Sequence, residues 1–592
     1  MKFHKFKEII NNFFKILKFV ETKNRFKFAV LQIHIFFSTI LETLSIFTII
    51  PIIESFNNSS ESKILNILSN YFEPRFLSPI NLVMGFFFIL ILSNAYQIII
   101  KKRIIDFSYA LVLDLQKKLF QKVINRKYKF FINKDIAFFN NLILHEVHRL
   151  KSGFIESSLF ILSQILLIML TFIGLIIYDY TVTIIIILSL LTFYLFYILL
   201  VGSKIYSASK LNTNFKKNTI QYLNDIFSVI KTLVFKKNKS KFYEKLESFL
   251  SQNNKINAFE QVVRAVLKNL FEIYFMIIIL IFIYLKESTI QINTLLSYGI
   301  FIFAAYKIVP SLHGLYSHFL SFIGSSNSLR IISEELTNSN QYPKIFENNF
   351  KINKVELQNI SLSYDKKKDV LRNIDYELPE NKIIGISGKS GSGKTTFIDL
   401  VSGLIDPTSG NLLINGKANK INSSLQLSNS AYCSQKTILI DDTIKNNICL
   451  ETDNNNINKE LLLKSIEVAE LNDFIKSFEN GVNTIIGEDG VRVSGGEAQR
   501  INIARTIYSN RKFIFFDESL NNLDMITSKK ILNNLKKIEY GKTIFFITHD
   551  LRLLDSFEEI LIFDDGILIE KGSFSKLKAC SEIFSELLDK KL

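Results

Sequence analysis

Residues 388–395, Gly-Lys-Ser-Gly-Ser-Gly-Lys-Thr, have the composition and spacing of a loop that cradles phosphate. The apolar run ahead of them, 383–387, is typical of a buried strand, and a helical pattern begins at Lys394. Glycines let backbone N–H groups approach phosphate closely, and the helix N-terminus adds partial positive charge. We expect Lys394 to reach the β- and γ-phosphates and the Thr395 hydroxyl to ligate Mg²⁺. The sequence therefore predicts a bound nucleotide.

A second hydrophobic run, 512–516, ends in two carboxylates, Asp517 and Glu518. Asp517 suits Mg²⁺ coordination, directly or through water, and Glu518 is placed to polarise an attacking water as general base. By itself, a strand that ends in Asp-Glu is common surface chemistry. The phosphate-binding loop favours the catalytic interpretation.

A third motif, Val493-Ser-Gly-Gly-Glu-Ala-Gln-Arg500, lies shortly before that strand. In this order and spacing the three motifs resemble those of the ATP-binding cassette (ABC) family. The resemblance implies that Tyr364 stacks on adenine, that Gln435 senses Mg²⁺, and that His549 is the switch histidine. It implies that Ser494, Gly495 and Gly496 contact the γ-phosphate bound by the opposite subunit. The remaining expected ATP contacts are Gly388, Ser390, Gly391, Gly393, Lys394, Thr395 and Thr396, and the expected Mg²⁺ ligands are Thr395, Gln435 and Asp517.

Some positions depart from the family pattern. The third motif, which matches the family signature, has Val493 where Leu is usual and Glu497 where Gln is usual. The segment that matches the family D-loop, Ser519–Asp524, has Asn521-Asn522 where a Ser-Ala pair is typical. None of these changes removes a phosphate ligand or the general base, so we expect hydrolysis to persist.

The resemblance also implies a second subunit. Because the signature acts in trans, one cassette cannot complete a site, and a second half-transporter subunit is required. A homodimer is the simplest assembly, since one chain holds all the catalytic motifs; a heterodimer stays open.

The first half of the chain carries six apolar runs, each near the roughly 20 residues that cross a bilayer. They lie at 28–56, 80–100, 154–178, 182–201, 270–285 and 294–323. The loops after the second and fourth runs are long and rich in Lys and Arg, whereas the other loops hold few basic residues. The positive-inside rule therefore places both termini and the cassette in the cytoplasm. We expect a multi-pass protein of the cytoplasmic (inner) membrane.

Ionisable residues within apolar spans are costly and are therefore candidate functional residues. Glu42 falls in the first run, and Lys307 and His313 fall in the sixth. They could instead pair with one another and serve packing only. In the architecture that the sequence resembles, these spans line the pathway, which favours a cavity-facing role for Glu42 and Lys307. We include His313 as a further candidate substrate contact.

Composition narrows the function classes. The net charge of +16 would suit nucleic acid, but many basic residues lie between apolar runs, where they would flank a bilayer. We therefore expect membrane lipids as partners and no nucleic acid. The three cysteines, Cys433, Cys449 and Cys580, show no CxxC spacing, so neither a zinc site nor a disulfide framework is indicated.

The predicted fold is an α-helical six-span membrane domain followed by an α/β P-loop nucleotide-binding domain, in ABC exporter architecture. We place an interfacial amphipathic helix at 1–27, the transmembrane domain at 28–330, a linker at 331–350 and the cassette at 351–592. In exporters of this class, loops such as those around 130–146 and 223–235 carry short helices that dock onto the cassettes.

Three stretches, 40–51, 130–149 and 304–312, resemble lipid-linked oligosaccharide flippases. We therefore expect an ATP-hydrolysing exporter or flippase that moves an amphiphilic substrate, a lipid-linked glycan or a lipid, by alternating access. Export of peptides or drug-like amphiphiles, or an ATP-gated channel or regulator on the same fold, are the alternatives.

Overall fold

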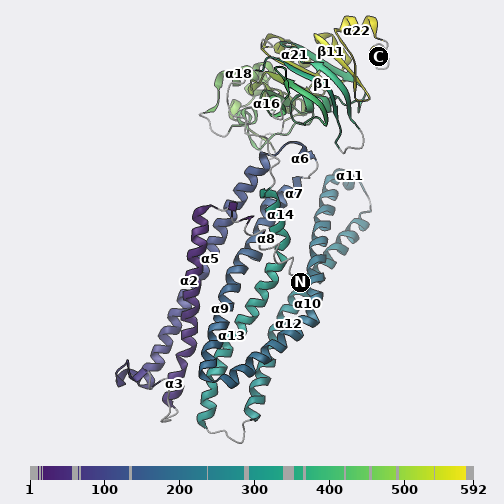
Figure 1. The fold of residues 1–592 in the computed structure, drawn as a ribbon. Coiled ribbons are helices and arrows are strands. Elements are labelled where there is room, and N and C mark those ends of the chain that lie inside the picture. Colours follow the sequence, from purple (N-terminus) through teal and green to yellow (C-terminus); the bar gives the residue numbers. More distant parts are fainter. Residues whose placement is uncertain are drawn as a thin grey trace. The chain divides into compact units, whose positions relative to one another are not determined.

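The computed structural model contains a helical unit and an α/β unit (Figure 1). The helical unit is Met1–Ile124 with Ile136–Ser339, and the α/β unit is Asn125–Asp135 with Asn340–Leu592. The structure describes residues 11, 15–16, 18–19, 21–56, 65, 68–132, 136–236, 238–285, 292–337, 352–364, 369–418, 422–451, 456–487, 493–538, 541–581 and 584.

Long helices build the helical unit because its apolar runs continue into polar helical extensions. The principal helices are α2 (Thr22–Phe47), α3 (Ile49–Phe56), α5 (Pro79–Ile124), α9 (Ser157–Tyr178), α10 (Tyr180–Ser228), α12 (Ser240–Leu285), α13 (Ile292–Gly324) and α14 (Ser326–Thr337). Short turns of helix connect them: η1 (Pro74–Leu77), α7 (Ile136–Asn140), η2 (Asn141–Glu146), α8 (Val147–Leu150), η3 (Lys151–Glu156) and α11 (Ile230–Val234). The tight turn between α9 and α10 forms at Asp179, whose carboxylate accepts hydrogen bonds from the first backbone N–H groups of α10.

Four described helical stretches are long and apolar enough to cross a membrane: Thr22–Ser55, Pro79–Ile124, Phe138–Tyr178 and Gly299–Gly324. They contain the first, second, third and sixth predicted spans. The fourth predicted span begins with a shorter apolar helix, Tyr180–Phe193, and the fifth lies at the end of α12. Six spans therefore stay a prediction, of which these four are the clearest.

The expected boundaries of the helical unit fall partly outside the described residues. Of residues 1–20 the structure describes only five, so the interfacial helix expected at 1–27 lies largely outside, and α2 already begins at Thr22. At the other end, α14 extends to Thr337, so the first part of the expected linker is helical.

Close packing in the helical unit joins α2 with α5 and α9 with α13. Ile46 and Ile50 are buried with Leu175, Ile300 and Ala304 in one apolar cluster. A side chain at Gly174 of α9 would overlap the ring of Phe47 at the end of α2, so a glycine is required where α9 meets α2.

A six-stranded sheet organises the α/β unit, with strand order β12-β11-β3-β10-β9-β6. Its strands are β3 (Ile383–Gly388), β6 (Ser430–Cys433), β9 (Phe513–Asp517), β10 (Thr543–Ile547), β11 (Glu559–Asp564) and β12 (Ile567–Gly572), and all pairings are parallel except that of β11 with β12. Every residue of β3, β9 and β10 is buried, as expected for parallel strands covered on both faces.

The two faces of this sheet belong to two separate apolar cores. One face contributes Phe516 and Phe546 to a core that also contains α20 (Gly495–Tyr508) and α21 (Met525–Ile538). The other face contributes Phe515 and Phe545 to a core with α15 (Lys394–Val401) and a second sheet. That sheet has the order β2-β1-β4-β5, from β1 (Val355–Leu362), β2 (Leu371–Glu377), β4 (Ser409–Ile414) and β5 (Lys417–Ala418).

Smaller elements complete the α/β unit. They are α6 (Lys129–Ile132), α16 (Asn422–Ser428), β7 (Asp442–Thr443), α17 (Ile444–Cys449), α18 (Lys459–Val468), α19 (Asn472–Lys476), η6 (Gly481–Asn483), β8 (Ile485–Ile486), η7 (Leu551–Ser556) and α22 (Phe574–Cys580). The segment around α6 comes from the loop that follows α5, yet it packs with this unit. Lys127 forms an ion pair of 2.7 Å with Asp406, and Arg126 is buried with its guanidinium over the Phe130 ring.

Candidate nucleotide site and membrane cavity

The predicted nucleotide residues gather at one edge of the six-stranded sheet. The phosphate-binding loop follows β3, Asp517 ends β9, His549 follows β10 and Gln435 follows β6. Because these four strands are parallel neighbours, their carboxyl ends lie side by side, which is where α/β sheets bind ligands. Residues more than 160 positions apart in the sequence thus share one site.

The loop between β3 and α15 has the backbone geometry that only glycine adopts readily. Gly391 and Gly393 have φ of 80° and 95°, in the left-handed region, and Gly393 is the residue before the first turn of α15. The Lys394 ammonium is buried inside the loop, where it donates to the carbonyls of Gly388 (3.0 Å) and Lys389 (2.7 Å). A phosphate at the N-terminus of α15 would meet this ammonium, while Ser390 and Gly391 are exposed at the loop tip.

Thr395 and Asp517, two of the three expected Mg²⁺ ligands, lie together. The Thr395 hydroxyl donates to Asp517 Oδ1 at 3.3 Å, and the Tyr432 hydroxyl donates to Oδ2 at 3.0 Å. Burial raises the pKa of Asp517, and the negative charge of Glu518 adds to the effect. A hydroxyl, one carboxylate and the oxygens of a nucleotide are ligands that suit Mg²⁺. Gln435, the third expected ligand, contacts Glu518 instead.

Glu518 has side-chain contacts at both carboxylate oxygens. Gln435 Nε2 (2.7 Å) and Asn521 Nδ2 (3.0 Å) donate to Oε2, and His549 Nε2 lies 3.0 Å from Oε1. The backbone of Glu518 has φ of 47°, a left-handed conformation that is uncommon for residues other than glycine. Such backbone geometry is found at catalytic positions because the surrounding structure compels it.

Asn521 is a contact that the sequence did not reveal. It appeared there only as a departure from a Ser-Ala pair, yet its side chain reaches Glu518 and its backbone N–H closes a turn on the Glu518 carbonyl at 3.2 Å. The available signal was its position, three residues after the expected general base, where a polar side chain can return to the carboxylate.

The adenine-stacking candidate, Tyr364, lies beside the first turn of α15. Its hydroxyl is 3.4 Å from the Thr396 hydroxyl, and 38% of the residue is exposed. Burial raises the pKa of its phenol, so the hydroxyl is uncharged at neutral pH. The tyrosine is therefore close to the phosphate-binding loop and retains an accessible surface.

The signature residues form the N-terminus of α20. Ser494 accepts a hydrogen bond from the Glu497 N–H at 3.3 Å, and the Glu497 carboxylate accepts one from the Ser494 N–H at 2.7 Å. This is a capping box, and it explains why glutamate is tolerated where Gln is usual, since either side chain offers an oxygen to that N–H. Among described residues, no hydrogen bond joins Ser494, Gly495 or Gly496 to the phosphate-binding loop of the same chain.

A second carboxylate, Asp399, is buried near Asp517 and was not anticipated from the sequence. It lies on α15, and burial followed by repulsion from Asp517 raises its pKa to about 6, against an opposing hydrogen bond from Tyr432. Tyr128, from the segment beside α6, is close enough for Asp399 and Asp517 to add to the burial that raises its own pKa. The loop that follows α5 thus contributes a phenol near Asp517.

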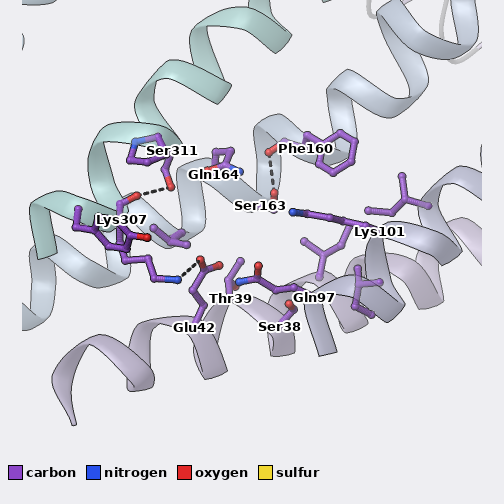
Figure 2. A pocket seen from close by; sticks show the side chains of 16 residues that line it. Ser38, Thr39, Glu42, Gln97, Lys101, Phe160, Ser163, Gln164, Lys307 and Ser311 are labelled. Carbon is purple, nitrogen blue, oxygen red and sulfur yellow. Dashed lines mark hydrogen bonds and ion pairs between the residues drawn. The ribbon is translucent and has the colours of Figure 1, made fainter. Parts of the chain in front are cut away.

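The helical unit holds a cavity of about 290 Å³ among α2, α5, α9 and α13 (Figure 2). Sixteen described residues line it: Ile35, Ser38, Thr39, Glu42, Gln97, Ile100, Lys101, Ile104, Phe160, Ser163, Gln164, Leu167, Tyr306, Lys307, Pro310 and Ser311. Glu42 and Lys307, both selected from the sequence, form an ion pair across it at 3.6 Å. His313 is not among these lining residues, whereas Lys101 is.

Part of the α/β unit matches a known protein family. Residues 371–521 match the ABC transporter family model. The ATP-dependent lipid A-core flippase of Photobacterium profundum is 35% identical over 228 residues, which are 38% of this chain and 38% of that protein. The protein of the same description from Salmonella typhimurium is 32% identical over 235 residues, 39% of this chain and 40% of that protein. The chain thus matches about two fifths of the length of these relatives.

A solved structure matches over nearly the whole chain. A bacterial Atm1-family ABC exporter with ATP bound superimposes with a TM-score of 0.76, covering 95% of this chain and 99% of that one, at 17% identity. Identity this low shows the fold alone. The chain therefore contains an ABC transporter ATP-binding domain joined to a membrane-spanning helical region with the fold of an Atm1-family ABC exporter.

Proposed function

We propose that this chain is one half of an ATP-hydrolysing exporter that moves a lipid-like amphiphile across the cytoplasmic membrane. The observation that carries the proposal is the convergence of Lys394, Asp517 and Glu518 at one sheet edge, in a chain whose other unit has helices able to cross a bilayer. The convergence supplies phosphate binding, a metal ligand and a base; the helices supply a route through lipid.

The roles of the residues follow from their contacts. Lys394 and the N–H groups at the start of α15 would hold the phosphates of ATP, and Tyr364 would support the base. Thr395 and Asp517 would hold Mg²⁺, which supplies charge neutralisation on the phosphates when bound. Glu518 would accept a proton from the water that attacks the γ-phosphate, so that ATP and water give ADP and phosphate. Gln435 and His549 orient the Glu518 carboxylate from its two sides.

A second subunit is part of the proposal. Ser494 and Gly495 are exposed at the N-terminus of a 14-residue helix and leave the loop of their own chain untouched among described residues. A helix N-terminus with free N–H groups suits a phosphate presented by another chain. We infer that two copies of this chain pair so that each signature faces the nucleotide of the other.

The substrate class is inferred from the relatives and the chemistry of the helical unit. Two relatives at 32–35% identity carry the description lipid A-core flippase. We therefore propose a lipid-like amphiphile as the general substrate class and a lipid-linked glycan as the specific substrate within it. With cassette and termini in the cytoplasm, transport would run from the inner leaflet outwards.

ATP hydrolysis and lipid movement in reconstituted vesicles test the proposal. We expect the wild type to hydrolyse ATP and to move a fluorescent lipid between leaflets, and Glu518→Gln to lose both while still binding ATP. Glu497→Gln is the matched control, because the amide oxygen preserves the capping box. ATP hydrolysis without lipid movement, accompanied by an ATP-dependent ion current, would instead support a channel. No hydrolysis by the pure chain would contradict the homodimer.

A further inference from the structure

We propose that the cavity among α2, α5, α9 and α13 binds the anionic phosphate headgroup of a lipid. The phosphate contacts Lys101 first, and the Lys307–Glu42 ion pair must open before the phosphate reaches Lys307. The inference rests on the proposed function and names the headgroup chemistry that such an exporter would select. It is carried by unpaired polar atoms, by the charge balance of the lining and by the hydrogen-bonding roles of its hydroxyls.

Two glutamines of the lining have atoms that lack partners. Gln97 Nε2 and Gln164 Oε1 are shielded from solvent and make no hydrogen bond with any described residue. The large majority of buried side-chain polar atoms in native proteins are hydrogen-bonded, so two unpaired amide atoms on residues that line one cavity call for an explanation. Once these shielded amides turn towards the cavity, a ligand that both accepts and donates hydrogen bonds would satisfy them.

The charges of the lining are unbalanced. Two ammonium groups, Lys101 and Lys307, stand against one carboxylate, Glu42. Lys307 is paired with Glu42, and Lys101 makes no ion pair with any described residue. Because no described carboxylate balances the Lys101 ammonium, the cavity favours an anion. Phosphate is the anion that membrane lipids present in quantity.

The hydroxyls of the lining restrict what the rest of the ligand can be. Thr39, Ser163 and Ser311 each donate to a backbone carbonyl, at 2.7, 2.8 and 2.8 Å, so their remaining capacity is to accept. Pro310 has no N–H to donate to the Tyr306 carbonyl one turn earlier, which leaves a further acceptor in this part of α13. These groups suit hydroxyls on the headgroup.

The size and length of the cavity also suit a headgroup. A volume of about 290 Å³ equals that of roughly ten water molecules, too small for two acyl chains. Figure 2 shows Lys101 and the Lys307–Glu42 pair at opposite ends of the lining, and the α2 wall from Ile35 to Glu42 covers about 10 Å. One phosphate therefore meets one ammonium at a time.

Because the two ammonium groups are separated, a phosphate that enters beside Lys101 does not yet contact Lys307. It reaches Lys307 only when Glu42 releases that ammonium, so the Glu42 carboxylate competes with the ligand. The ion pair is long, at 3.6 Å, and both side chains retain some exposure, which makes such exchange inexpensive. Removing Lys101 and removing the charge of Glu42 should then have opposite effects on binding.

Binding of dihexanoyl phosphatidic acid to the purified full-length chain, without ATP, tests the inference. We expect Lys101→Gln to weaken binding about tenfold, Lys101→Arg to restore it, and Glu42→Gln to strengthen it several-fold. Lys102→Gln is the matched control, since Lys102 is the adjacent exposed lysine and does not line the cavity. Melting temperatures and gel filtration verify that each variant is folded.

Competitors distinguish the possible ligands. Dihexanoyl glycerol, which lacks phosphate, should fail to compete, and inorganic phosphate should compete only weakly. Equal competition by inorganic phosphate would assign the cavity to a free anion and overturn the lipid assignment; unchanged binding in Lys101→Gln would overturn the site. ATP hydrolysis in the same preparations reports separately on the proposed function, because it depends on Glu518 and not on the cavity.

Discussion

Each unit of this protein holds a carboxylate in a polar pocket, and the two are held differently. In the α/β unit, Glu518 contacts three side chains at 2.7–3.0 Å on a strained backbone. In the helical unit, Glu42 lies within α2 and makes one ion pair, of 3.6 Å, with Lys307 of α13. A carboxylate that must be in place for one reaction is held by several short contacts. A carboxylate that must yield to a ligand is held by one long contact.

The neighbouring lysines follow the same contrast. Lys394 is buried within a glycine-rich loop and bonds two carbonyls of that loop, whereas Lys307 reaches across a cavity between separate helices. One arrangement is local in sequence, and the other depends on how α2 and α13 pack.

The largest expected effect tests whether the two lysines are as different as their surroundings. Lys394→Ala should lower affinity for ATP by tenfold to about a hundredfold, because a charge-assisted contact to phosphate is lost. Lys307→Ala should leave ATP affinity unchanged. Equilibrium binding of a fluorescent ATP analogue measures both. A marked loss in Lys307→Ala would show that the units are energetically coupled at rest, which would break the contrast.

A smaller effect is expected from releasing one of the three contacts on Glu518. Asn521→Ser removes one of the two amides that contact Oε2, so the Glu518 carboxylate should be positioned less firmly. We expect kcat for ATP to decrease about threefold with KM unchanged, because Gln435 and His549 still hold the carboxylate. Steady-state ATP hydrolysis measures both constants.

The adjacent residue provides the control for that change. Asn522 is exposed and makes no side-chain hydrogen bond to Glu518 among the described residues, so Asn522→Ser should leave kcat as it is. An unchanged or higher kcat in Asn521→Ser would mean that the amide does not position Glu518 for attack. Equal effects at both positions would assign the change to the loop as a whole.

Sequence predicted the α/β unit more completely than the helical unit for a physical reason. In the α/β unit the candidate site residues lie at the ends of buried strands, so local motifs and strand order together place Gly388, Asp517 and His549 at one edge. The motifs did not reveal Asn521 or Asp399. Asn521 stands out because its side chain contacts Glu518, and Asp399 because it is buried in the folded chain.

In the helical unit the apolar runs predicted spans and singled out Glu42 and Lys307. Hydropathy reports that a residue lies in a span but not which neighbour its side chain faces. Lys101, which directly follows the second apolar run, lines the cavity, whereas His313, a candidate substrate contact, is not among the lining residues. Helix packing, which decides these facings, leaves little trace in a single sequence.

Substitution of Asp399 tests whether burial near Asp517 raises the pKa of the Asp399 carboxyl. Its pKa is raised from 3.8 to about 6 in the folded chain, so the folded state holds the proton more tightly and loses stability as pH rises from 3.8 through 6. Asp399→Asn removes this loss. The gain in stability should be about 1 kcal/mol larger at pH 8 than at pH 5.

The thermal midpoint of the ATP-binding domain, followed by calorimetry of the full chain at both pH values, measures that difference. Asp406→Asn is the control, because Asp406 is exposed and pairs with Lys127. A gain independent of pH would point to improved packing by the amide in place of a relieved charge.

The smallest expected effect concerns the Lys307–Glu42 ion pair. Thermal midpoints of the wild type, Glu42→Gln, Lys307→Gln and the double variant form a cycle that isolates the pair. A long, partly exposed ion pair should contribute less than about 1 kcal/mol, so the shifts of the single variants should add in the double variant to within a few degrees. A coupling of several kcal/mol would mean that Glu42 holds Lys307 as firmly as Gln435 and Asn521 hold Glu518. The headgroup would then have to displace a tight pair, and the contrast between a held carboxylate and a yielding one would fail.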